Sequence, residues 1–205
     1  SYRFQQNVDD ANYWVEVLYN FGYRKIIVIG HGEGALIGNL LTQQNNKITK
    51  YISIAGAGRT GDVILKEQYS KMSPTVRDSA YSVIDSLKNQ VLVPRLSPWL
   101  FSVFRPSMQP YIISWMNINP SVEIAKLTLP VAIIQGSTDF QMNVNDAEAL
   151  HKNCPQSKLY IINDMNHLLK KVVNDKEQNR ASYNNPSLML HPELIVYIIS
   201  FIKGN

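Results

Sequence analysis

The chain has 205 residues, of which 45% are hydrophobic, so it can fill the core of one large domain or two small ones. Its formal net charge is only +4, and the cationic residues are scattered rather than gathered in a block, which argues against a nucleic-acid partner. No apolar run is long enough to span a membrane, so we expect a soluble protein. The compartment stays open, with the cytoplasm slightly favoured, because the sequence starts at Ser1 and shows no signal peptide.

The first part of the chain predicts a helix and then two strands with a second helix between them. Apolar residues recur at steps of three and four from Phe4 to Leu18, as on one face of a helix. Runs rich in β-branched residues at 25–29 and 51–55 predict buried strands, and a helix begins near residue 33 and ends in the polar tract 43–46. A strand, a helix and a strand with short connections form a right-handed crossover, so we expect the two strands to be parallel neighbours.

Residues 58–126 separate the second strand from the third, and they are too many for one loop in a compact domain. Their periodicity predicts short helices, several with proline in the first turn, at 62–69, 74–88, 98–104 and 106–116, and a short turn near 120–126. Aromatic residues gather here, and we take Trp99, Phe104, Tyr111 and Trp115 as candidates for lining a substrate pocket. Two interpretations stay open: a helical cap that packs its own core, and a lid that covers an apolar pocket.

The last part of the chain returns to alternating strands and helices. We expect a strand at 131–136, a helix at 145–153, a strand at 158–162, a mobile polar insertion at 174–185 and a helix from Pro192. This alternation predicts an α/β fold with a mostly parallel sheet flanked by helices. The expected domains are a core formed by residues 1–57 and 127–205 and a helical lid insertion at 58–126.

The sharpest local signal is Gly30-His31-Gly32-Glu33-Gly34, where the first strand turns into a helix. Small flanking residues let the strand and the helix pack closely, and their spacing is that of a nucleophile elbow. The apex residue of such a turn adopts a strained backbone conformation that lifts its side chain above the sheet. Here the apex is Gly32, so the geometry is expected without the hydroxyl or thiol that it normally displays.

Two more candidates follow later strands. Asp139 comes after the third strand and His167 after the fourth, and ligands of open parallel sheets bind beyond these carboxyl ends. With an apex, a carboxylate and a histidine in this order, the chain from Phe4 onward resembles an α/β-hydrolase, whose elbow is usually Gly-x-Ser-x-Gly. The segments Gly136-Ser137-Thr138-Asp139 and Asn166-His167 are similar to the acid and histidine motifs of that family.

The resemblance implies nucleophilic acyl transfer. His167 would be the general base, Asp139 would orient it, and the backbone N–H of Glu33 would be one donor of the oxyanion hole. His31 is expected to pack beside the elbow as part of the substrate pocket. No cofactor is expected, and we expect no metal either, because His31 and His167 lack a third ligand.

Other nucleophiles are not favoured. Ser137 and Thr138 lie near the acid but not on an elbow, and Cys154, the only cysteine, ends a helix away from the expected site. A single cysteine also excludes an intrachain disulfide and a cysteine metal cluster.

The chain departs from the family pattern before the elbow, where it supplies one helix instead of several strands. Without neighbours, the elbow strand would be a long apolar sheet edge, which invites aggregation. We therefore expect an N-terminally incomplete α/β-hydrolase fold, completed by a missing N-terminal segment or by a second chain.

The expected function is that of a carboxylic ester hydrolase inactivated by Gly32, with a small-molecule ester as partner. Glycine suits the strained turn, but a triad without its nucleophile loses on the order of a millionfold in turnover. The alternative is a natural non-catalytic relative that binds a small apolar ligand under its lid.

Overall fold

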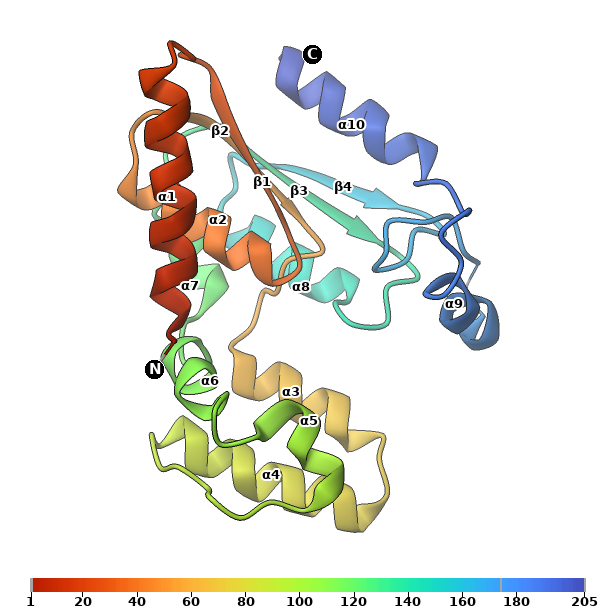
Figure 1. Cartoon of the computed structure of the whole chain (residues 1–205). Coiled ribbons are helices and arrows are strands. Elements are labelled where there is room, and N and C mark those ends of the chain that lie inside the picture. Colours follow the sequence, from red (N-terminus) through yellow and green to blue (C-terminus); the bar gives the residue numbers. More distant parts are fainter. Residues whose placement is uncertain (1, 174, 205) are drawn as a thin grey trace. The chain divides into compact units, whose positions relative to one another are not determined.

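The computed structural model describes residues 2–173 and 175–204 (Figure 1). Within these residues the chain forms two compact units. Residues 11–58 and 120–204 form the sheet unit, and residues 2–10 and 59–119 form the helical unit. The expected domain limits and the lid role of 58–126 stay predictions, and residues 1 and 205, the ends of the expected core, lie outside the described residues.

The sheet unit contains four parallel strands in the order in which they occur along the chain. They are β1 (Ile26–His31), β2 (Ile48–Ile54), β3 (Val131–Gly136) and β4 (Lys158–Ile162). The parallel pairing of the first two strands is confirmed, as is the α/β class. The carboxyl ends of parallel strands lie at one edge of a sheet, so residues that follow different strands can meet there.

Side chains of β2 and β3 alternate between two apolar layers, as the period of a strand requires. Ile52 and Ile134 face the layer that includes Leu194 of α10 (Pro192–Lys203). Tyr51 and Ile133 face the opposite layer, which α7 (Pro120–Ile124) and α8 (Val144–Asn153) help to build. Figure 1 shows α10 and α8 on opposite sides of the sheet. Helices on both faces leave β3 buried along its whole length.

The helical unit packs short helices around its own apolar cluster. Its elements are α3 (Gly61–Ser70), α4 (Pro74–Lys88), η1 (Pro98–Leu100), α5 (Phe101–Phe104) and α6 (Gln109–Trp115). Ile84, Leu87 and Phe104 are fully buried in the cluster. The sequence pattern therefore identified helices in this segment correctly, although the stretch at 98–104 is split into a 3-10 turn and one helical turn.

Helix α1 (Phe4–Asn20) contributes to both units, whereas the sequence analysis assigned all of it to the sheet. In the helical unit the ring of Phe4 lies 6.1 Å from that of Tyr111 and 6.4 Å from that of Trp115. Asn7 donates a hydrogen bond of 2.9 Å to the Tyr111 hydroxyl. An apolar stripe predicts that a helix face is buried, but it does not say against which partner.

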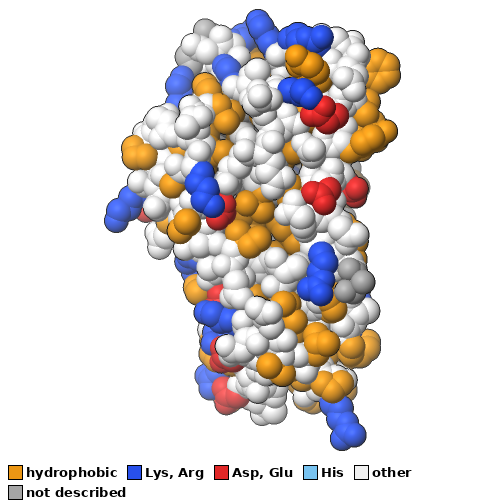
Figure 2. Space-filling view, turned by 90° about the vertical axis from the view of Figure 1, so that its left-hand side faces the viewer, with side chains coloured by type: hydrophobic (Ala, Val, Ile, Leu, Met, Phe, Trp, Pro, Cys, Tyr) orange, Lys and Arg blue, Asp and Glu red, His pale blue; other side chains and the backbone are white. Residues whose placement is uncertain are grey.

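Charged side chains are dispersed over the face of the molecule drawn in Figure 2, with hydrophobic side chains between them. Among the described residues, no helix is long and apolar enough to cross a membrane.

Candidate functional site

The turn between β1 and α2 (Glu33–Gln44) has the geometry expected of an elbow. Gly32 is the N-cap of α2 and has φ 58° and ψ −120°, a conformation that side-chain-bearing residues rarely adopt. Its N–H donates a hydrogen bond of 3.0 Å to the carbonyl of Ile54 in β2. The sheet therefore holds the apex residue in place although it carries no side chain.

The two glycines that flank the apex are not equivalent. A Cβ placed on Gly30 would lie 2.2 Å from the carbonyl oxygen of Gly34, so the strand and the helix approach too closely for any side chain there. A Cβ on Gly34 would meet nothing within 4 Å. The expectation that both flanks must be small therefore holds for Gly30 and not for Gly34.

Asp139 and His167 lie in contact, as their positions after β3 and β4 predicted. Nδ1 of His167 is 2.8 Å from Oδ2 of Asp139, whose side chain is fully buried. An ionised carboxylate only accepts hydrogen bonds, so Nδ1 carries the hydrogen and Nε2 of the neutral ring is left as an acceptor. This is the tautomer that a general base needs.

The remaining nitrogen faces the apex of the elbow. A Cβ built on Gly32 would lie 3.5 Å from Nε2 of His167 and 3.7 Å from its Cε1, both ordinary van der Waals distances. The structure thus brings Gly32, His167 and Asp139 together in one row. The row has room for a small side chain at its first position.

His31 lies beside His167, with the two ring centroids 4.9 Å apart. Its Nε2 is 2.9 Å from the carbonyl oxygen of His167, so it donates a hydrogen bond to the backbone of the histidine loop. Partial desolvation of the ring lowers the pKa of His31, and nearby His167 lowers it further. His31 is therefore placed to hold the loop, as well as to border the site.

Gln135 is a supporting residue that the sequence analysis missed. Its Nε2 donates to Oδ2 of Asp139 at 3.2 Å and to the carbonyl of Met142 at 2.9 Å. Oδ1 of Asp139 accepts from the backbone N–H groups of Gln141 and Met142. The signal in the sequence was a glutamine inside an apolar strand, because a polar side chain that a strand buries needs hydrogen-bond partners, and Gln135 is fully buried.

Helix α9 (Lys176–Ser182) is the second missed support. It occupies most of the stretch that was expected to be mobile, of which Asn174 lies outside the described residues. Asn179 donates a hydrogen bond of 2.7 Å to the carbonyl of Thr138, next to the acid. Ser182 accepts one of 2.7 Å from Asn166, next to the base. A single helix therefore anchors both loops that carry the Asp139–His167 pair.

The other predicted residues of the chemistry are placed as follows. Glu33 is the first residue of α2, so its backbone N–H lies at the positive end of the helix dipole. Ser137 accepts a hydrogen bond from the N–H of Asp164, and Thr138 donates one to the carbonyl of Val172. Cys154 is buried in the core, and burial raises the pKa of its thiol. The described residues contain no group of three potential metal ligands.

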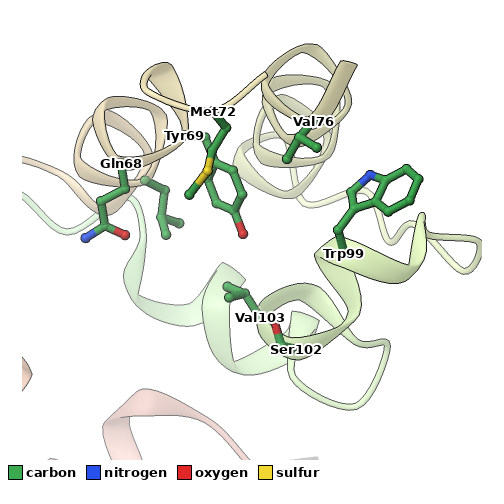
Figure 3. A pocket seen from close by; sticks show the side chains of 8 residues that line it. Gln68, Tyr69, Met72, Val76, Trp99, Ser102 and Val103 are labelled. Carbon is green, nitrogen blue, oxygen red and sulfur yellow. The ribbon is translucent and has the colours of Figure 1, made fainter. Parts of the chain in front are cut away.

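The four aromatic candidates are spread through the helical unit. Phe104 is fully buried, while Tyr111 and Trp115 pack against Phe4. Trp99 is the only one of the four that lines the cavity between α3, α4 and α5 shown in Figure 3.

Comparisons with known proteins support the fold. No family model matches the chain, and no curated protein matches it. A candidate non-heme bromoperoxidase, BpoC of Mycobacterium tuberculosis H37Rv, superimposes with a TM-score of 0.55 at 17% identity, over 98% of this chain and 75% of that one. A lipase-esterase related protein of Clostridium acetobutylicum ATCC 824 superimposes with a TM-score of 0.52 at 19% identity, over 86% of this chain and 73% of that one. Rv0554 of Mycobacterium tuberculosis superimposes with a TM-score of 0.53 at 18% identity, over 90% of this chain and 72% of that one. The chain has the α/β-hydrolase fold.

Proposed function

We propose that the site is a hydrolase-type acyl-transfer site that lacks its nucleophile, in the framework of a carboxylic ester hydrolase. One observation carries the proposal: Nδ1 of His167 is bonded to Asp139 at 2.8 Å while its Nε2 faces the empty apex of the elbow at Gly32. A histidine held in this tautomer beside an elbow is suited to take a proton from a hydroxyl at the apex.

The chemistry of the complete site follows from these positions. With serine at position 32, Nε2 of His167 would take the hydroxyl proton as oxygen attacks the ester carbonyl, and Asp139 would stabilise the imidazolium. The backbone N–H of Glu33 would donate to the oxyanion. His167 would then protonate the leaving alcohol, and water would hydrolyse the acyl-enzyme in a second step of the same kind. With glycine at position 32 no acyl-enzyme forms, so we expect the unaltered chain to be inactive on esters.

The test restores the nucleophile. We expect Gly32→Ser to react covalently with a fluorophosphonate at position 32, as measured by intact mass and peptide mapping, because the reagent reports an activated hydroxyl without requiring complete turnover. The double variant Gly32→Ser/His167→Ala and the unaltered chain should not react. Hydrolysis of short aryl esters by Gly32→Ser would extend the result from reactivity to turnover.

The outcome that rejects the proposal is a folded Gly32→Ser variant that the reagent leaves unmodified, or one that reacts equally without His167. The positive φ at position 32 costs about 1–3 kcal/mol for a residue with a side chain, so circular dichroism must first show that the variant is folded.

A second candidate is a non-catalytic relative that binds a small apolar ligand. The glycine itself favours it, because Gly32 adopts the elbow conformation without strain while it removes the reacting group. An unreactive Gly32→Ser variant together with measurable ligand binding would support this second function.

A further inference from the structure

The helical unit contains a cavity of about 470 Å³ that plays no part in the proposed chemistry. It lies between α3, α4 and α5, and every residue that lines it belongs to the helical unit. Figure 3 shows its walls, with Tyr69 and Met72 on one side and Val103 and Ser102 opposite. The volume lies within the range of roughly 300–1,000 Å³ that is typical of sites for small organic molecules.

The hydroxyl of Tyr69 is the distinctive polar group of this cavity. The Tyr69 ring is half-buried and packs against Phe104 with the centroids 5.7 Å apart, which fixes its direction. Its hydroxyl reaches into the space toward Val103 and Ser102 (Figure 3). Within the described part of the chain, no hydrogen bond to this hydroxyl is formed. Burial raises the pKa of Tyr69, so the group stays protonated and can donate.

The remaining lining narrows the class of ligand. The walls are mainly aliphatic and aromatic, from Leu65, Met72, Val76, Trp99 and Val103, and no lining residue is charged. Met72, Trp99 and Val103 are partly exposed, so the cavity opens to solvent on one side. Its walls offer a charged group no counter-charge, and the apolar lining favours a bound molecule that is uncharged. Gln68 and Ser102 add polar atoms at the wall, but they are exposed and already reach water.

We propose that this cavity binds an uncharged, mainly apolar carbonyl compound, such as an aryl or alkyl ketone or ester, with the Tyr69 hydroxyl donating a hydrogen bond to its carbonyl oxygen. The apolar body fills the space between Met72, Val76 and Val103. The residues that line this site belong to the helical unit, whereas Asp139 and His167 belong to the sheet unit, and the proposal does not rest on the proposed hydrolase function.

The experiment uses Prodan, an uncharged naphthyl ketone whose emission shifts to the blue in apolar surroundings and to the red when its carbonyl accepts a hydrogen bond. Titration of the full chain should show saturable binding at one site per chain. Tyr69→Phe keeps the ring and removes the donor, so we expect binding to weaken roughly three- to tenfold and the emission to shift further to the blue. An analogue of Prodan with a methylene in place of the carbonyl should bind both proteins equally.

A second pair of variants tests the location. Val103→Trp fills the cavity and should abolish saturable binding, whereas Val91→Trp adds the same group at an exposed position that does not line it and should bind normally. His167→Ala should leave Prodan binding unchanged, which separates this result from any failure of the proposed function.

Several results would overturn the proposal. They are no saturable binding to the full chain, equal binding by the two tryptophan variants, or equal Prodan affinity with and without the Tyr69 hydroxyl. If Val103→Trp does not fold, the affinities of Tyr69→Phe for Prodan and for the methylene analogue still test the proposal, because Tyr69→Phe removes only one oxygen atom.

Discussion

The strand ends of the sheet unit and the interior of the helical unit hold their side chains by different interactions. At the strand ends, Asp139 accepts hydrogen bonds from Gln135 and from its own loop, and α9 ties that loop to the histidine loop. In the helical unit, Leu87 and Phe104 are held by apolar contacts on every side. Hydrogen bonds fix the direction of particular atoms, whereas apolar packing fixes volume and shape.

This difference matches what the two proposed sites would need. An acid–base pair works only if its nitrogen and oxygen atoms keep their orientation, so it needs polar supports. A cavity for an apolar molecule needs walls, and aliphatic residues supply them. Substitutions in the helical core should therefore cost stability, while substitutions at the strand ends should change geometry with a smaller cost.

The largest effect is expected for Phe104→Ala. The ring is fully buried and contacts Tyr69, so its removal should lower the free energy of unfolding by about 3–5 kcal/mol. Hydrogen exchange followed by mass spectrometry should show lost protection in residues 59–119 and little change in 120–173. Phe101→Ala, at an exposed position of the same helix, is the control. Equal loss of protection in both units would contradict the separation into two units.

A smaller effect is expected at the elbow, where the strand and the helix pack closely at Gly30 but not at Gly34. Gly30→Ala has to displace the backbone of Gly34, so we expect a loss of about 1–3 kcal/mol, measured by chemical denaturation. Gly34→Ala meets no atom and lies in the first turn of α2, so it should be neutral or stabilising by about 0.4–1 kcal/mol. A similar loss of stability in both variants would contradict the open space beside Gly34.

These two glycines also show how far the sequence could be interpreted. The elbow, the parallel pairing of the first two strands and the meeting of Asp139 with His167 were predictable, because apolar runs mark the strands and the carboxyl ends of parallel strands lie at one edge of the sheet. The unequal roles of Gly30 and Gly34 were not, since they depend on the angle at which the helix leaves the strand. Spacing within the motif is the same for both.

Helix α9 was missed for a different reason. Its residues are nearly all polar, so no apolar periodicity marks it, and its stability depends on Asn179 and Ser182 bonding to loops that are distant in sequence. The packing of the first turn of α1 against the helical unit was not predictable either, because the apolar character of Phe4 predicts burial but not the residues that it contacts. Tertiary contacts, rather than local propensity, determine both.

Asn179→Ala tests the polar support directly. It leaves the carbonyl of Thr138 without its buried donor, so we expect a loss of about 1–2 kcal/mol and faster hydrogen exchange in residues 137–142 and 163–172. Gln178→Ala, on the exposed side of the same helix, is the matched control. In the Gly32→Ser background, Asn179→Ala should also slow reaction with the fluorophosphonate. Unchanged exchange in both loops would mean that α9 does not anchor them.

The smallest effect is expected from the titration of His31. Its folded pKa lies below the ordinary value of 6.5, because partial desolvation and then the neighbouring His167 disfavour the charged ring. Between these two values the unfolded chain binds more protons than the native one, so the free energy of unfolding rises with pH through this window and falls as the solution becomes more acidic. His31→Gln removes this contribution and should give a flatter dependence below pH 6.5 than the unaltered chain. Proton NMR of the imidazoles should find His31 titrating below 6.5, and a value at or above 6.5 would contradict the partial desolvation of the ring that lowers its pKa.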